Sequence, residues 1–297
     1  MRTLFSLLVV VACSSSPGPD TDQIEADPRA DDPDGWPSEV TGNDSERPAM
    51  VMTPSDYTWD EYGLLPVVVL LHGFGANSSL QDLIFQLQFR TDEGFLLVLP
   101  EGTKNPDGLQ FWNATEECCD FYGSGVDDAG YLLSLLDEVE EHFPVDSERI
   151  VFTGHSNGGY MSHRLACEAA DRIAGIASLA GATYQSASQC TPSEPISMLQ
   201  MHGDLDASVL YEGTSNYPGA EAIADRYADY NSCGGSVDDP DRDYVDSLSG
   251  AETRVRRYEG CDGVTTELWT HVGSAHVPLF NDAWRADLLS WLLEQRL

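Results

Sequence analysis

Residues 149–158 read RIVFTGHSNG, and an amphipathic helical pattern continues from them to residue 169. Arg149 is followed by the apolar residues 150–152, and together these four predict a strand. The following G-x-S-x-G pattern places Ser156 between a strand and a helix, which is the context of a nucleophile elbow. The pentapeptide alone is common, so the prediction depends on its flanks. Ser156 is the candidate nucleophile because the elbow projects a serine hydroxyl above the sheet.

Apolar runs alternate with helical patterns on both sides of this stretch. Strands are predicted at 66–71, 95–99, 149–152, 173–179, 196–201 and 268–272, and helices at 80–90, 127–142, 156–169, 220–230 and 282–293. Continuous apolar strands separated by helices are typical of a mostly parallel sheet covered on both faces. The predicted fold class is therefore α/β, with the α/β-hydrolase fold as its specific form.

An elbow serine requires a base, and α/β-hydrolases carry the acid and then the histidine after the serine. His271 lies inside the predicted strand 268–272, whereas His276 follows it in a loop of small residues. A loop allows the imidazole to reach Ser156, so His276 is the predicted base.

The acid is expected after the strand 196–201. Asp204 and Asp206 both lie there, and either can be a turn residue. Asp206 lies deeper in the loop and is the preferred acid, which would hold the tautomer of His276.

Two backbone N–H groups are needed to stabilise an oxyanion. Asn157 follows the nucleophile and supplies one candidate, and Phe74, between Gly73 and Gly75 after the strand 66–71, supplies the other. His72 precedes this loop and is interpreted as its structural support.

Acidic residues dominate the composition. The 297 residues include 50 Asp and Glu against 15 Lys and Arg, for a net charge of −35. This balance excludes nucleic acids and anionic membrane surfaces as partners. A saline habitat and an acidic surface encoded by a GC-rich genome both account for it. The 41% hydrophobic content is sufficient for a sizeable core.

The first residues read as a targeting segment. Residues 1–13 combine Arg2, a short apolar run and Cys13, as in a lipoprotein signal peptide with a lipidated cysteine; ordinary signal cleavage is the alternative. Residues 14–47 hold ten acidic residues and five prolines, which predicts a disordered linker. Residues 48–297 are predicted to be the catalytic domain, located outside the cell or in its envelope, with the membrane reached only through Cys13.

Six cysteines remain in that domain: Cys118, Cys119, Cys167, Cys190, Cys233 and Cys261. The even number and the absence of CxxC or zinc spacing indicate three disulfides in an oxidising compartment. Fifteen pairings are possible.

Several pieces, in order, carry a family resemblance. They are His72 to Gly75, Trp112 to Ala114 with Cys118 and Cys119, residues 126–131, 154–160 and 165–168, His202-Gly203 with Asp206, residues 231–234, Gly260-Cys261 and His276. The chain from about residue 49 resembles the polyhydroxybutyrate depolymerase and feruloyl/acetylxylan esterases of carbohydrate esterase family one. The resemblance implies a secreted serine esterase with Asp206 as acid and His276 as base. It also implies a Cys233–Cys261 disulfide, which leaves Cys118 and Cys119 to pair with Cys167 and Cys190 in either order.

Two departures from the family pattern lie beside the site. Leu210 replaces a usual proline, and the tryptophan usual after the histidine is missing beyond His276. Substrate preference is therefore open. Phe111, Trp112 and Tyr160 either form an apolar wall, which would make Trp112 and Tyr160 substrate contacts, or belong to the core.

No cofactor or metal is expected. The acidic run 238–243 lacks the glycine that an EF-hand loop needs and is interpreted as a solvated loop. The chain contains no phosphate-binding glycine motif and no HExxH.

Three functions remain open. A monomeric serine esterase acting on polymeric or oligomeric ester substrates is the leading hypothesis. A serine peptidase on the same fold would use the same acyl-enzyme chemistry. A non-catalytic module that binds polysaccharide or polyester is the third, although binding alone would not require a complete Ser-Asp-His set.

Overall fold

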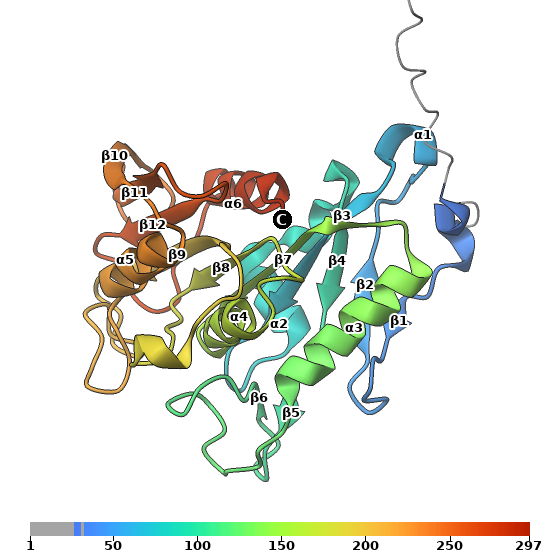
Figure 1. The fold of residues 1–297 in the computed structure, drawn as a ribbon, viewed down its shortest axis with the longest axis horizontal. Coiled ribbons are helices and arrows are strands. Elements are labelled where there is room, and N and C mark those ends of the chain that lie inside the picture. The colour runs from blue at the N-terminus through green and yellow to red at the C-terminus, as the bar shows by residue number, and fades with distance from the viewer. Residues whose placement is uncertain (1–26, 31–32) are drawn as a thin grey trace, which may run out of the picture.

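The computed structural model describes residues 27–30 and 33–297, and its centre is a ten-stranded sheet (Figure 1). The strand order is β1-β2-β4-β3-β7-β8-β9-β12-β11-β10. Their bounds are β1 Glu39–Val40, β2 Ala49–Met52, β3 Leu65–Leu71, β4 Leu96–Leu99, β7 Val145–His155, β8 Gly175–Leu179, β9 Ser197–Gly203, β10 Gly235–Arg242, β11 Thr253–Glu259 and β12 Thr266–His271. A separate hairpin pairs β5 (Thr103–Lys104) with β6 (Gln110–Phe111).

The six central strands, β4 to β12 in that order, are parallel, and the strands at both edges are antiparallel. All seven residues of β3 are buried, and successive side chains enter opposite cores. Val67 and Val69 face one core, while Val68 and Leu70 face the other. A strand buried on both faces is mostly apolar, which explains why the β3 run was recognisable in the sequence.

Helices cover both faces. The helices are α1 Trp59–Tyr62, α2 Ser78–Phe85, α3 Asp128–His142, α4 Asn157–Glu168, α5 Ala220–Tyr230 and α6 Asp282–Glu294. Apolar side chains of α3, α4 and α5 enter the core on one face of the sheet, and those of α2 and α6 enter the core on the other. Figure 1 shows α4 lying over the centre of the sheet, beside β7 and β8. The predicted α/β-hydrolase architecture is confirmed. Among the described residues, no helix is long and apolar enough to span a membrane.

The acidic run 238–243 is not a loop, as the sequence suggested. Most of it belongs to β10, an edge strand paired with β11. Arg256 and Arg257 on β11 lie 3.6 Å from Asp238 and 3.3 Å from Asp239, respectively. These cross-strand ion pairs offset the repulsion between the carboxylates, so the strand forms despite its charge.

The domain begins earlier than the predicted boundary at residue 48. Val40 is fully buried in β1, which pairs with β2, and Trp36 packs against Phe143 with ring centroids 5.3 Å apart. The prediction of a disordered linker is therefore wrong for residues 33–47, because the partners of this polar segment are supplied by the rest of the chain. The predicted signal peptide, Cys13 and the linker up to residue 26 lie outside the described residues.

The six cysteines of the domain form three disulfides. Cys233 pairs with Cys261, as the resemblance implies. The expectation that Cys118 and Cys119 pair with Cys167 and Cys190 is wrong. Cys118 bonds to its neighbour Cys119, and Cys167 bonds to Cys190. Cys167 lies in the last turn of α4, and its Cα atom is 4.8 Å from that of Cys190, a normal separation for a disulfide.

Candidate active site

The candidate triad residues follow three strands that run parallel. Ser156 follows β7, Asp206 lies three residues after β9, and His276 lies five residues after β12. The carboxyl ends of parallel strands lie at one edge of the sheet, where α/β proteins build their sites. Neighbouring β9 and β12 end in register, with Gly203 opposite His271.

The turn at Ser156 has the strained backbone of an elbow. Ser156 has φ 55° and ψ −117°, a combination that non-glycine residues rarely adopt, and α4 begins at the next residue. The two glycines of the motif are required sterically. A Cβ on Gly158 would lie 2.2 Å from the carbonyl oxygen of Leu71, and one on Gly154 would lie 2.6 Å from the Gly158 backbone. The close packing of β7, α4 and β3 therefore fixes the turn.

Asp206 and His276 are in direct contact. Asp206 Oδ2 lies 2.6 Å from His276 Nδ1, while Asp206 Oδ1 accepts the backbone N–H groups of Ser208 at 2.8 Å and Val209 at 3.0 Å. The Asp206 carboxylate is fully buried, whereas the His276 ring is 19% exposed. Burial acts to raise the pKa of Asp206, but the hydrogen bonds from His202 and His276 outweigh it and hold that pKa well below its ordinary value. Asp206 is therefore ionised and oriented toward His276.

The competing residues lie elsewhere. The Asp204 carboxylate accepts the backbone N–H of Gly273 at 2.6 Å, which ties its turn to the loop that carries His276. His271 is locked in β12, where its Nδ1 lies 2.8 Å from Thr253 Oγ1, and burial lowers its pKa to about 3. Neither side chain makes a hydrogen bond or ion pair with Asp206 or His276.

The predicted oxyanion loop lies beside the elbow. A Cβ on Gly73 would lie 3.6 Å from the Cβ of Ser156, so the following residue, Phe74, is close to the nucleophile. The flanking N–H groups are bonded, that of Gly73 to Gln81 Oε1 at 3.0 Å and that of Gly75 to the Gln110 carbonyl at 2.8 Å. Asn157 is the first residue of α4, and its N–H has no intrahelical acceptor.

Two buried rings support this loop. His72 Nε2 accepts the Gly102 N–H at 2.9 Å and Nδ1 lies 2.8 Å from the Gly73 carbonyl, so Nδ1 carries the proton. The Trp112 indole donates to the His72 carbonyl at 2.9 Å. Burial lowers the pKa of His72, so the ring stays neutral in this support role.

The prediction that Trp112 and Tyr160 contact substrate is wrong. Trp112 is fully buried and Tyr160 is 2% exposed, and the third residue of the supposed wall, Phe111, is 1% exposed. All three belong to the core. An exposed apolar side chain near the oxyanion loop is that of Phe121, which is 66% exposed. Its ring centroid lies 5.5 Å from that of Phe74.

The Asn157 side chain joins the elbow to the loop that carries the adjacent-cysteine disulfide. Its amide exchanges two hydrogen bonds with the Trp112 backbone, at 2.8 and 2.9 Å, and its Nδ2 lies 3.4 Å from Cys118 Sγ. These contacts hold residues 112–118 against the first residue of α4, and Phe121 follows this segment.

Sequence reasoning missed two histidines of the site. His155 Nε2 lies 2.9 Å from the His276 carbonyl oxygen, so the residue before Ser156 anchors the loop of the base. His202 Nε2 lies 3.2 Å from Asp206 Oδ2. Their positions inside the elbow and inside the His-Gly-x-x-Asp pattern are the only sequence signals that point to them.

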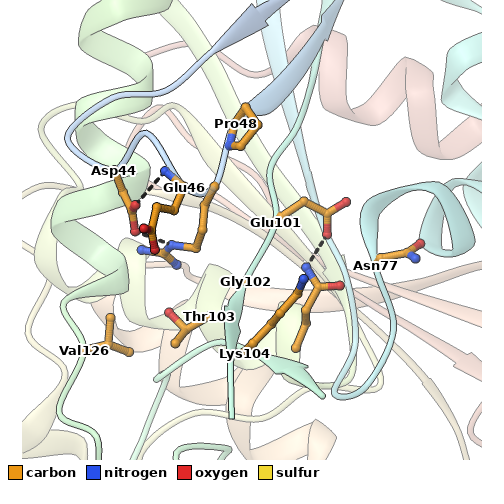
Figure 2. Close-up of a pocket in the computed structure, with 11 residues that line it drawn as sticks. Asp44, Glu46, Pro48, Asn77, Glu101, Gly102, Thr103, Lys104 and Val126 are labelled. Carbon is orange, nitrogen blue, oxygen red and sulfur yellow. Dashed lines mark hydrogen bonds and ion pairs between the residues drawn. The ribbon is translucent and has the colours of Figure 1, made fainter. Parts of the chain in front are cut away.

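A pocket of about 630 Å³ is lined mainly by residues of the segments 44–48 and 101–104. Figure 2 shows Asp44 and Glu46 on one side of it and Glu101 and Asn77 on the other. Glu101 accepts a hydrogen bond of 2.7 Å from the Gln110 amide. Neither Ser156 nor His276 lines this pocket, so it is separate from the candidate triad.

Known proteins resemble the chain in sequence. It is 30% identical over 154 residues to a putative esterase, NocK, of Nocardia uniformis subsp. tsuyamanensis, covering 52% of this chain and 43% of the relative. It is 26% identical over 244 residues to feruloyl esterase B of Piromyces equi, covering 77% of this chain and 42% of the relative. The chain thus spans about two fifths of the length of these relatives.

The fold has solved counterparts. The structure of acetyl xylan esterase from Aspergillus awamori superposes with a TM-score of 0.60 at 13% identity, covering 86% of this chain and 97% of that one. The phospholipase/carboxylesterase family model matches residues 64–218, which include the oxyanion loop, the elbow and Asp206. With more than half of its length matched, the chain belongs to the phospholipase/carboxylesterase family of α/β-hydrolases.

Proposed function

We propose that the protein is a serine esterase that hydrolyses carboxylic esters through Ser156, His276 and Asp206. The observation that carries the proposal is the 2.6 Å contact between Asp206 Oδ2 and His276 Nδ1 at the sheet edge where Ser156 occupies a strained elbow. Family membership and relatives named as esterases support the same reaction class.

In this mechanism the Asp206–His276 contact sets the direction of proton transfer. Asp206 accepts the Nδ1–H of His276, which leaves Nε2 free to take the proton of Ser156 Oγ as the oxygen attacks the ester carbonyl. The N–H groups of Phe74 and Asn157 would stabilise the oxyanion. His276 then gives the proton to the departing alcohol, and water releases the acyl group by the same sequence of steps.

The substrates proposed are feruloyl or acetyl esters of plant polysaccharide, or a polyhydroxyalkanoate-type polyester. Similarity to proteins named as feruloyl and acetylxylan esterases supports the first class. The exposed Phe121 beside Phe74 supports an apolar acyl group on this side of Ser156, because aromatic side chains favour apolar contact. We further propose a secreted or Cys13-anchored enzyme, to which the three disulfides lend support.

A hydrolysis panel tests the proposal. Wild-type protein should hydrolyse at least one of p-nitrophenyl acetate, methyl ferulate and a hydroxybutyrate oligomer, and should leave peptide amides intact. Ser156→Ala should abolish this activity and leave the thermal unfolding curve nearly unchanged. Ser208→Ala is the matched control, because this exposed residue contacts Asp206 through its backbone N–H, which the variant retains. Retention of most activity in Ser156→Ala would contradict the mechanism.

A further inference from the structure

A buried chain of polar side chains leads from α5 to the carboxylate of Asp206. The chain runs from Tyr227 through His163 and Gln200 to His202, and each of these residues is at most 1% exposed. We propose that this chain fixes the proton of His202 on Nε2, so that His202 donates to Asp206 and positions the acid of the triad. The proposal rests on the proposed function and assigns His202 as a positioning residue for it.

The orientation of the Gln200 amide follows from one carbonyl. The Gly181 carbonyl oxygen lies 2.9 Å from one end of the amide, and a carbonyl can only accept, so that end must be the NH₂ group. The same NH₂ group lies 3.2 Å from His202 Nδ1. The amide oxygen therefore faces His163, at 3.0 Å from its Nε2.

This orientation determines both imidazole tautomers. His202 Nδ1 accepts from the NH₂ group, so Nε2 carries the proton; its N–H donates to the Val209 carbonyl at 2.9 Å, and Asp206 Oδ2 lies 3.2 Å from the same nitrogen. His163 Nε2 donates to the amide oxygen, and its Nδ1, 3.1 Å from the Tyr227 hydroxyl, accepts. The hydrogen bonds between these side chains thus all point from α5 toward His202.

Burial keeps this chain in one state. His163 has no exposed surface, and desolvation lowers its pKa to about 4, so it stays neutral at physiological pH. A buried polar group that loses its partner is costly, so no member can reorient alone. The chain is therefore a rigid support rather than a surface contact.

His202 matters because of its position beside Asp206 Oδ2. Without His202, the only polar contact described for this oxygen would be His276 Nδ1. Oδ2 lies 2.6 Å from His276 Nδ1 and 3.2 Å from His202 Nε2, and Oδ1 accepts two backbone N–H groups. Within the described part of the chain, no arginine or lysine lies within 4.0 Å of this carboxylate. The Nε2–H of His202, placed between the Val209 carbonyl and Asp206 Oδ2, therefore holds the carboxylate toward His276 and shares its charge between two rings.

Enzyme kinetics on the full-length protein test the proposal. His202→Phe removes the donor and should lower kcat about tenfold with KM unchanged, because one hydrogen bond to a charged group is lost. The acidic limb of the kcat/KM profile should move to higher pH by about half a unit, since the undivided charge of Asp206 then favours protonated His276. His202→Gln can present an amide N–H near the Nε2 position and should recover most of both effects.

His271→Phe is the control for a purely structural role. His271 is another fully buried histidine on the adjacent strand, and this variant should lower the melting temperature without moving the acidic limb. A His202→Phe enzyme with wild-type kcat and an unmoved limb would overturn the proposal. If this variant does not fold, the wild-type protein still decides. Long-range ¹H–¹⁵N spectra should show the tautomer of His202 that carries its proton on Nε2, and a proton on Nδ1 would refute the chain.

These measurements separate the two proposals. If Ser156→Ala hydrolyses esters as fast as the wild type, the proposed function fails while the tautomer of His202 is still measured. If Ser156→Ala is inactive but His202→Phe behaves like His271→Phe, only the positioning role fails.

Discussion

Arg47 provides the most direct test of how the N-terminal segment is attached. Its guanidinium lies 2.6 Å from the fully buried Asp128 carboxylate and 3.9 Å from the ring centroid of Tyr131, and its side chain is only 12% exposed. Asp128 also accepts the Asn113 N–H at 2.7 Å, and the neighbouring Trp112 is hydrogen-bonded to Asn157. Arg47→Met keeps most of the apolar length of the side chain and removes the charge.

The expected loss is large because one charge remains buried without its partner. Breaking a buried pair from one side costs about 3–5 kcal/mol of unfolding free energy. At about 2 °C per kcal/mol for a domain of this size, the melting temperature should fall by about 6–10 °C. Arg90→Met is the control, because Arg90 pairs with the half-exposed Glu93 and should change stability by less than about 1 kcal/mol.

The loss should also depend on pH. Burial raises the pKa of Asp128 above its unfolded value even with Arg47 present, and removal of Arg47 raises it further. A carboxyl group whose folded-state pKa is raised contributes fully below its unfolded pKa and loses that contribution as pH rises through the folded pKa. Arg47→Met should therefore be more destabilising at pH 8 than at pH 5.

Urea unfolding at these two pH values measures the effect. The double variant Arg47→Met/Asp128→Asn should recover part of the stability and lose the pH dependence, because no charge is then buried. A loss below 1 kcal/mol, or an equal loss at both pH values, would refute the view that residues 33–47 belong to the domain through this pair.

Two further predictions concern the site and the charge. Asp206→Asn should lower kcat by about 10³- to 10⁴-fold because it disturbs the tautomer of His276. Asp204→Asn should act mainly on stability, through the hydrogen bond that Asp204 accepts from Gly273. Steady-state kinetics of both variants test this, and a large loss of kcat in Asp204→Asn but not in Asp206→Asn would show that the assignment is wrong. Residues 48–297 carry a net charge of −28, and 1 M NaCl shortens the Debye length to about 3 Å, so the melting temperature should rise with salt and fall when a reductant opens the disulfides. Calorimetry across a salt series checks this, and a flat or falling curve would contradict it.

Local patterns carried most of the correct predictions. The elbow at Ser156 could be recognised because a strand, a turn and a helix are adjacent in sequence, and β3 because a strand buried on both faces is apolar throughout. The loops after β9 and β12 were located from these strands, which placed Asp206 and His276 at the same edge of the sheet. Sequence adjacency was sufficient in each case.

The errors concern interactions between distant residues. The segment 33–47 looked unable to fold because its partners, such as Asp128, lie elsewhere in the chain. The composition of the segment does not show that Arg47 forms an ion pair with the buried carboxylate of Asp128. Trp112 was a candidate for substrate contact because the sequence does not show whether an aromatic side chain in a loop faces the site or the core. In the structure its indole is buried and donates to the His72 carbonyl. The sequence did not suggest a role for His202, because the role proposed for it depends on the amide of Gln200 and the carbonyl of Gly181.

The edge strand β10 has a consequence for the behaviour of the protein in concentrated solution. An open sheet edge presents unpaired backbone groups on which another molecule can add a strand, the first step of aggregation. In β10 this edge carries Asp238, Asp239 and Asp241, and Pro240 has no N–H to offer a neighbour. A second copy approaching this edge would meet like charge and an interrupted hydrogen-bond ladder. We therefore expect the carboxylates of β10 to act as gatekeepers against self-association, and their neutralisation to produce fibrils or precipitate before it affects catalysis.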